Sequence, residues 1–166
     1  MRIFYIDYEN VRTEGLRGID KIDTKTKVFL VCGINDCIRL IDVNYIMKSK
    51  AKLEILPVQT GKKDALDFQL VTHLMLKYNK KNEYVIISKD QGYDFAIEMA
   101  KTLGKENIKR FDTILSANEA YEEVKKSKVE SKSCDNDISI IAPMIVGNIS
   151  QGETVYMQSL LSKVGG

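Results

Sequence analysis

Short, largely apolar runs alternate along the chain with segments whose apolar residues recur at helical spacing. Five runs rich in β-branched and aromatic residues occur at residues 3–6, 27–32, 52–58, 83–88 and 107–111. They are continuous rather than alternating with polar residues, which is typical of strands covered on both faces. The pattern predicts a parallel sheet of about five strands.

The segments between these runs favour helices. We expect helices over residues 36–47, entered through an Asn-Asp cap, 64–81, 92–103, ended by Gly104, and 116–126, opened by an SANE capping box. Strands and helices in this alternation, with right-handed crossovers, predict a three-layer α/β/α domain. The second and third helices have apolar stripes that we expect to face the core: Phe68, Leu70, Val71, Leu74, Met75 and Tyr78 in one, and Phe95, Ala96, Met99, Ala100 and Leu103 in the other.

The character of the chain changes after about residue 126. Residues 1–126 form the predicted domain, residues 127–137 are charged and Ser-rich like a linker, and residues 138–166 form a tail that regains hydrophobicity without clear periodicity. Three outcomes stay open for the tail: docking back as a strand and short helix, binding a second copy or another protein, or disorder.

Composition indicates a globular protein whose charge does not by itself attract polyanions. The 166 residues are 44% hydrophobic and 29% charged, with a formal net charge of +2. Any contact with nucleic acid must therefore come from a local group of lysines. No signal-like start is present, and the longest apolar tract contains Pro143 and is shorter than a bilayer span. We expect a cytoplasmic protein that makes no membrane contact.

Cysteine and histidine offer little catalytic chemistry. Cys32, Cys37 and Cys134 cannot all pair and lack CxxC spacing, so we expect reduced thiols, with Cys32 buried in its strand. His73 is the sole imidazole and lies among apolar residues of a predicted helix, which favours a structural role.

Carboxylates follow two of the predicted strands. Asp7 ends the first strand and Asp90 follows the fourth. Open parallel sheets bind ligands outside the carboxyl ends of their strands, where the strand order reverses. If the first and fourth strands are neighbours, as in a 3-2-1-4-5 sheet, Asp7 and Asp90 meet in one crevice.

Further acids lie at helix starts. Asp64 and Asp67 both project from one side of a first turn, and Asp67 shares its helix face with the apolar stripe. An ionised carboxylate that points inward is unfavourable unless it is paired or binds a cation. The alternative is that Asp64 only caps the helix, that Asp67 only complements the helix dipole, and that the strand-end acids only form turns.

Together these acids predict a metal site. Asp7, Asp64 or Asp67, Asp90 and Asp94 would supply only oxygen ligands, which suit Mg²⁺ or Mn²⁺ and argue against zinc. Without a cation, such close carboxylates would repel one another and raise one another's pKa values. With one or two cations they could hydrolyse a phosphodiester without a protein nucleophile.

Three ordered motifs resemble those of PIN-like nucleases, closest to the NYN branch: DYEN at 7–10, KDALD at 63–67 and SKDQGYDF at 88–95. The resemblance extends over residues 1–126 in motif order and spacing. It implies a 3-2-1-4-5 parallel sheet and RNA cleavage with a divalent metal. The motif after the fourth strand departs from the commoner pattern, because its two acids are four positions apart instead of two.

The resemblance also implies individual roles. Asp7 and Asp90 would be the central metal ligands, Asp64 would be the acid of the helix start, and Asp67 would share or replace its role. Asp94 would complete the set, directly or through water. Asn10 would hold a substrate phosphate or orient Asp7.

The flanking residues suggest how RNA would bind. Lys62, Lys63 and Lys89 could hold phosphates beside the scissile bond, and Tyr8 or Tyr93 could stack on an unpaired base, which favours single-stranded or looped RNA. Alternatively, the lysines only make the rim soluble and the tyrosines pack on neighbouring helices.

Two other classes of function are alternatives to a metal-dependent ribonuclease. The first is a catalytically weak or inactive RNA-binding or scaffold protein of the same fold, whose tail mediates assembly. The second is a phosphorylation receiver, which needs a phosphoacceptor after the third strand, where PVQTGKK has no Asp. A phosphate-binding P-loop is also unsupported, because GKKD lacks the upstream Gly and the following Ser or Thr.

Overall fold

The computed structural model describes residues 1–59 and 65–127. The chain divides into two compact units, Met1–Tyr121 and Glu122–Gly166. Of the second unit, residues 122–127 are described, and they are helical. Lys62, Lys63 and Asp64 lie outside the described residues, as do the linker beyond residue 127 and the whole tail. The predictions that fall on them stay predictions.

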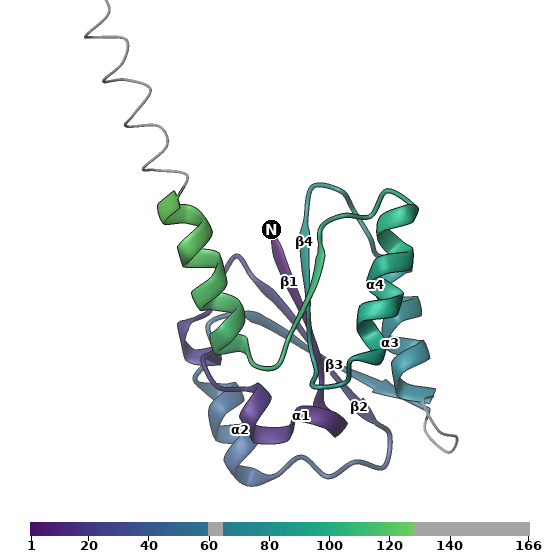
Figure 1. Ribbon diagram of the computed structural model, residues 1–166. Coiled ribbons are helices and arrows are strands. Elements are labelled where there is room, and N and C mark those ends of the chain that lie inside the picture. Colours follow the sequence, from purple (N-terminus) through teal and green to yellow (C-terminus); the bar gives the residue numbers. More distant parts are fainter. Residues whose placement is uncertain (60–64, 128–166) are drawn as a thin grey trace, which may run out of the picture. The chain divides into compact units, whose positions relative to one another are not determined.

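The first unit contains a five-stranded, all-parallel sheet with the strand order β3-β2-β1-β4-β5, which confirms the predicted fold (Figure 1). Every pairing is parallel, and β1 lies between β2 and β4. β2 and β3 follow one another outward on one side of β1, and β4 and β5 lie on the other side of β1. The strand order therefore reverses between β1 and β4. The strands are β1 (Arg2–Asp7), β2 (Lys27–Gly33), β3 (Lys52–Val58), β4 (Glu83–Ile87) and β5 (Ile108–Phe111).

Helices cover both faces of this sheet, as the continuous apolar runs predicted. Successive side chains of β1 point to opposite faces: Ile3 and Tyr5 pack with α3 and α4, whereas Phe4 and Ile6 pack with α1, α2 and the helical residues 114–121. The helices of the first unit are α1 (Tyr8–Gly15), α2 (Leu40–Met47), α3 (Ala65–Leu76), α4 (Gly92–Thr102) and the short 3-10 helix η1 (Ile19–Lys21).

Two predicted helix starts are wrong, one by four residues and one by two. α2 begins after Arg39 rather than at Asp36, because the Asp36 carboxylate accepts a hydrogen bond from the Gly33 backbone N–H at 2.7 Å and closes a turn there. The last helix begins at residue 114, and its cap is Thr113, whose Oγ1 accepts a hydrogen bond from the Ser116 backbone N–H at 3.0 Å. Ser116 of the SANE sequence is thus already inside the helix.

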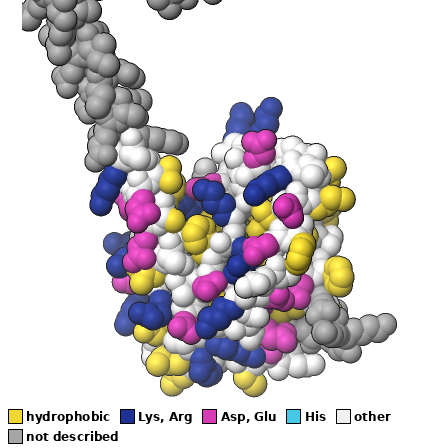
Figure 2. Space-filling model, viewed as in Figure 1, with side chains coloured by type: hydrophobic (Ala, Val, Ile, Leu, Met, Phe, Trp, Pro, Cys, Tyr) yellow, Lys and Arg dark blue, Asp and Glu magenta, His cyan; other side chains and the backbone are white. Residues whose placement is uncertain are grey.

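The predicted inner stripe of α4 is largely wrong. Phe95, Met99 and Leu103 are exposed, whereas Tyr93 and Ile97 are buried. α4 carries two apolar stripes, and the one that begins at Tyr93 faces the sheet. In Figure 2 apolar side chains gather on the outer surface over α4.

The inner stripe of α3 is partly as expected. Leu70 and Leu74 are buried in the core, and Val71, Met75 and Tyr78 pack against it, but Phe68 is exposed. The helix also ends at Leu76, short of the expected Lys81.

A buried carboxylate ties α1 to α2. Asp42 of α2 has no exposed surface and accepts hydrogen bonds from the Tyr8 hydroxyl at 2.6 Å, from the Thr13 hydroxyl and from Arg39 Nε at 3.0 Å. Tyr8 and Thr13 both belong to α1, so Asp42 holds that helix in place. Because Tyr8 directly follows Asp7, the same contact fixes the chain beside the end of β1.

The histidine and cysteine expectations hold for the described residues. His73 Nδ1 shares a hydrogen bond with the Tyr5 hydroxyl at 3.0 Å, and its ring packs edge-on against Phe29, which is a structural role. Cys32 is buried in β2 and Cys37 is exposed, and neither forms a disulfide. Across residues 1–59 and 65–127, no helix has the length and apolarity needed to cross a bilayer.

Candidate metal centre

The parallel register brings Asp7 and Ser88 together at the reversal point. Ile6 of β1 pairs with Ile87 of β4, so the next residues, Asp7 and Ser88, leave the sheet side by side. The Ser88 hydroxyl donates a hydrogen bond to Asp7 Oδ2 at 2.9 Å. This contact joins two positions that are 81 residues apart in the sequence.

Asp7 is a buried carboxylate surrounded by hydrogen-bond donors. It is only 2% exposed. Besides Ser88, the Asn10 backbone N–H donates to Oδ1 at 3.3 Å, which makes Asp7 the N-cap of α1, and the Tyr93 hydroxyl lies 3.3 Å from Oδ2. Burial nevertheless dominates these contacts and raises the pKa of Asp7 from 3.8 to about 6. This carboxyl therefore gives up its proton far less readily than an exposed aspartate.

Asp67 is the second carboxylate that the structure brings to this place. It lies half-buried in the first turn of α3, where the sequence predicted an inward-pointing acid. Its Oδ1 accepts a hydrogen bond from the Tyr93 hydroxyl at 2.6 Å, and the same hydroxyl contacts Asp7. The negative charge of Asp67 contributes to the raised pKa of Asp7.

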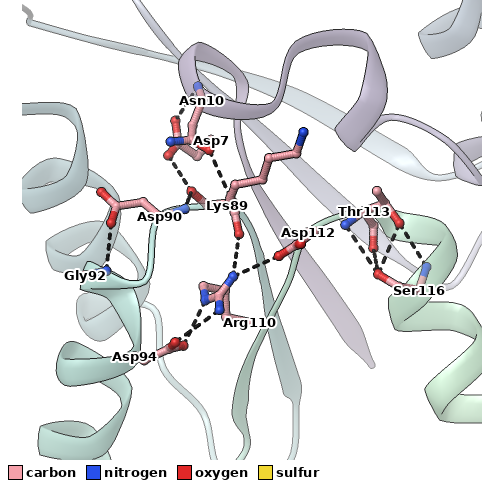
Figure 3. A network of polar contacts seen from close by, with 11 residues as sticks. Asp7, Asn10, Lys89, Asp90, Gly92, Asp94, Arg110, Asp112, Thr113 and Ser116 are labelled. Carbon is pink, nitrogen blue, oxygen red and sulfur yellow. Dashed lines mark hydrogen bonds and ion pairs between the residues drawn. The ribbon is translucent and has the colours of Figure 1, made fainter.

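Asp90 belongs to the same turn but faces the start of α4. Its backbone N–H donates to Ser88 Oγ at 3.1 Å, and its Oδ1 accepts a hydrogen bond from the Gly92 backbone N–H at 2.7 Å (Figure 3). A Cβ at position 92 would stand 3.1 Å from that carboxylate oxygen, so glycine permits the close approach. Within the described residues, the other carboxylate oxygen, Oδ2, accepts no such hydrogen bond from a backbone N–H.

Asp94 is not brought to Asp7. Arg110 of β5 donates to both Asp94 oxygens, from Nε at 2.8 Å and Nη2 at 3.1 Å, and this contact lowers the pKa of Asp94. Arg110 also donates to the Ser88 carbonyl at 2.8 Å and to Asp112 at 3.0 Å. Figure 3 shows Asp94 turned toward Arg110 and away from Asp7.

The residues that were expected to bind substrate differ in their exposure and contacts. Asn10 is exposed, and its Oδ1 accepts a hydrogen bond from the Lys89 backbone N–H at 2.9 Å, so α1 is tied to the turn after β4. The Lys89 side chain forms an exposed ion pair with Glu14 at 2.7 Å. Tyr8 and Tyr93 are buried and cannot stack on a base, which corrects the stacking hypothesis in favour of its packing alternative.

The roles of Ser88, Arg110 and the Tyr93 hydroxyl were not predicted from the sequence. Ser88 could have been found, because the neighbour of a β1-terminal residue in a 3-2-1-4-5 sheet is the residue that follows β4. The contact between Arg110 and Asp94 depends on the register of β5, for which no sequence signal exists.

The donor set suits a small hard cation that keeps several waters. Within the described part of the chain, no three Asp, Glu, His or Cys side chains come together as a closed metal-binding group. Mg²⁺ commonly binds through one or two carboxylates plus water and substrate phosphate. Asp7 and Asp67, linked through one hydroxyl, provide such a pair, and Asp90 stands in the adjoining turn. These residues fit a divalent cation.

The fold and site define an open parallel α/β domain with carboxylates at its topological switch point. The family model described as "PIN domain" matches residues 1–110, well over half of the chain. The chain therefore belongs to the PIN domain family, whose members are in general metal-dependent nucleases. No curated protein and no solved structure matches the chain.

Proposed function

We propose that this protein is a divalent-metal-dependent endoribonuclease whose metal site is built on Asp7, Asp67 and Asp90. The observation that carries the proposal is the meeting of Asp7 and Asp67 on one buried hydroxyl at the point where the strand order reverses. A buried carboxylate of this kind is unfavourable unless a cation or a proton neutralises it. Mg²⁺ or Mn²⁺ is the cation that an all-oxygen donor set suits.

Different residues of the site have different proposed roles in hydrolysis. A divalent ion bound here would activate water and stabilise negative charge on the phosphate. Asp7 and Asp67 would hold the ion, and Ser88 fixes the orientation of Asp7 through its hydrogen bond. Asp90 lies in the same turn and would become a ligand through its Oδ2. Asp64 is proposed as a further ligand from its place in the sequence, and Asp94 acts on the site through Arg110, which also binds the Ser88 carbonyl.

Substrate binding is proposed for residues at the rim. The Oδ1 of Asn10 is already occupied by the Lys89 backbone N–H, which fixes the amide plane and leaves its NH₂ group to donate to a phosphate oxygen. Lys89 would exchange Glu14 for a phosphate, and Lys62 and Lys63 would add positive charge. PIN nucleases act on RNA, and a single-stranded or looped RNA is the proposed substrate.

The sequence motifs also support a finer placement. We place the chain in the NYN-type branch on its DYEN and SKDQGYDF motifs, with residues 1–126 as the nuclease domain and 127–137 as a linker. The tail at 138–166 is proposed as a site of self-association or of binding to another protein.

One assay tests the enzymatic proposal. Purified protein is incubated with end-labelled single-stranded RNA, with a hairpin RNA and with single-stranded DNA, each with Mn²⁺, with Mg²⁺ and with EDTA. We expect internal cleavage of RNA that requires the metal. RNA that remains intact with both metals would refute the nuclease activity.

A second candidate is a catalytically inactive RNA-binding or scaffold protein of the same fold. The observation that favours it is the contact between Arg110 and Asp94, which withdraws one of the expected acids from the site. Gel-shift measurements in the same buffers separate the two candidates. Metal-independent RNA binding without cleavage selects the scaffold.

A further inference from the structure

The Tyr93 hydroxyl occupies an unusual position between two carboxylates. It lies 2.6 Å from Asp67 Oδ1 and 3.3 Å from Asp7 Oδ2, and the residue is only 2% exposed. A tyrosine hydroxyl has a single proton to donate. Two anions therefore compete for one donor, and the shorter distance shows that Asp67 receives the stronger hydrogen bond.

The position of this hydroxyl is set by the core and not by the acids. Tyr93 begins the buried stripe of α4, and its ring packs in the same cluster as Ile97 and Ala100. The two carboxylates, in contrast, come from separate elements, the end of β1 and the start of α3. Among the described side chains, only the hydroxyl of Tyr93 contacts both of them. Without it, two like charges would face each other, and no other hydrogen bond from the described residues would hold the Asp67 side chain inward.

We propose that Tyr93 is a positioning residue that holds Asp67 against Asp7 so that both carboxylates are in place when a divalent cation binds. This inference rests on the metal site of the proposed function and extends it to a residue that ligates nothing itself. Partners that orient metal ligands typically change metal affinity about 10- to 100-fold when they are mutated. The hydroxyl, and not the aromatic ring, carries this role.

The test is Mn²⁺ binding by the full chain, measured by isothermal titration calorimetry without RNA. Tyr93→Phe removes the hydroxyl and keeps the ring. We expect it to weaken Mn²⁺ binding about tenfold, the lower end of the range for such partners. Tyr84→Phe is the matched control, because Tyr84 is also buried and its hydroxyl, within residues 1–59 and 65–127, bonds to the backbone of Lys77 and Asn79 and to no carboxylate. Its Mn²⁺ affinity should equal that of the wild type.

A second variant separates positioning from general destabilisation. Asp67→Asn removes the charge that Tyr93 is proposed to hold, and it should also weaken Mn²⁺ binding. The double variant Tyr93→Phe/Asp67→Asn should bind no more weakly than Asp67→Asn alone, because position 67 then has no carboxylate for the hydroxyl to hold against Asp7. Additive losses would contradict the proposal. If Tyr93→Phe does not fold, unchanged Mn²⁺ affinity in Asp67→Asn still overturns it.

The outcomes distinguish this inference from the function beneath it. A wild-type protein that binds no Mn²⁺ removes both the metal site and the role of Tyr93. A wild-type protein that binds Mn²⁺, together with a Tyr93→Phe variant of equal affinity, removes only the role of Tyr93.

Discussion

Asp7 is destabilising in the metal-free protein, and this follows from its surroundings. It sits in the interior with Asp67 nearby, and three hydrogen-bond donors do not offset the loss of water. The folded state therefore binds its proton more tightly than the unfolded chain does. A buried carboxylate that destabilises the folded state has an explanation if its negative charge is needed to bind a cation.

The stability of the metal-free protein should consequently depend on pH through Asp7. The folded pKa is about 6 and the unfolded value is 3.8, so the folded state holds more protons between these values. Stability falls as pH rises through this window, by up to about 3 kcal/mol. Asp7→Asn should remove this fall and be more stable than the wild type at pH 7. Urea unfolding in EDTA at several pH values between 4 and 7 measures the free energy of unfolding of both proteins. The same change of this free energy with pH in the wild type and in Asp7→Asn would contradict the prediction.

Asp94 differs from Asp7 in its surroundings and should differ in its effect. It is exposed and paired with Arg110, which holds its pKa below the ordinary value. Asp94→Asn should therefore keep Mn²⁺ binding, whereas Asp7→Asn should lose it. Calorimetric titration of both variants makes the comparison. Equal loss of Mn²⁺ binding in both would restore Asp94 as a direct ligand.

At the scale of elements, α1 is held by one buried carboxylate in addition to the apolar packing of Tyr8 and Val11. Asp42 is the only fully buried residue of α2, and its partners Tyr8 and Thr13 lie on α1. Hydrogen bonds to a buried charge are stronger than those between neutral groups. The hydrogen bonds of Asp42 therefore join α1, the helix that follows Asp7, to α2.

Removing this carboxylate should therefore loosen α1. Asp42→Ala leaves the buried Tyr8 O–H without the acceptor of its proton, and we expect it to destabilise the protein by about 2–4 kcal/mol. Asn44→Ala, at an exposed position of the same helix, should change stability by less than about 0.5 kcal/mol. Thermal or urea unfolding measures both. Equal effects of the two substitutions would show that the buried network does not hold α1.

The same scale shows where the sequence is informative. The strands were predictable because their apolar runs are long and continuous, and the inward turn of Asp67 was predictable because it shares its face with Leu70 and Leu74. The inner face of α4 was not, because two apolar stripes compete, and only the structure shows that the one with Tyr93, Ile97 and Ala100 packs in the core. The start of α2 failed for a related reason, since Asp36 closes a turn with Gly33 instead of capping a helix.

At the scale of the whole domain, the strand order converts separate motifs into one site. Asp7 and Ser88 become neighbours only because β4 pairs with β1 on the side opposite β2. The acids of α3 and of the turn after β4 then lie at the same reversal point. The sequence predicted that Asp7, Asp64 or Asp67, Asp90 and Asp94 would share one site. Among the described residues, Asp7 and Asp67 meet on the Tyr93 hydroxyl, whereas Asp90 accepts a hydrogen bond from Gly92 and Asp94 pairs with Arg110.

The most direct test of the central claim is metal-dependent RNA cleavage by Asp7→Asn beside an unrelated Asp→Asn change. Asp20→Asn, at an exposed position of η1, serves as the control. With Mn²⁺ and single-stranded RNA, the wild type and Asp20→Asn should cleave equally, and Asp7→Asn should leave the RNA intact while remaining folded. Full cleavage by Asp7→Asn would contradict the account, because the carboxylate at the switch point would then play no part in the reaction.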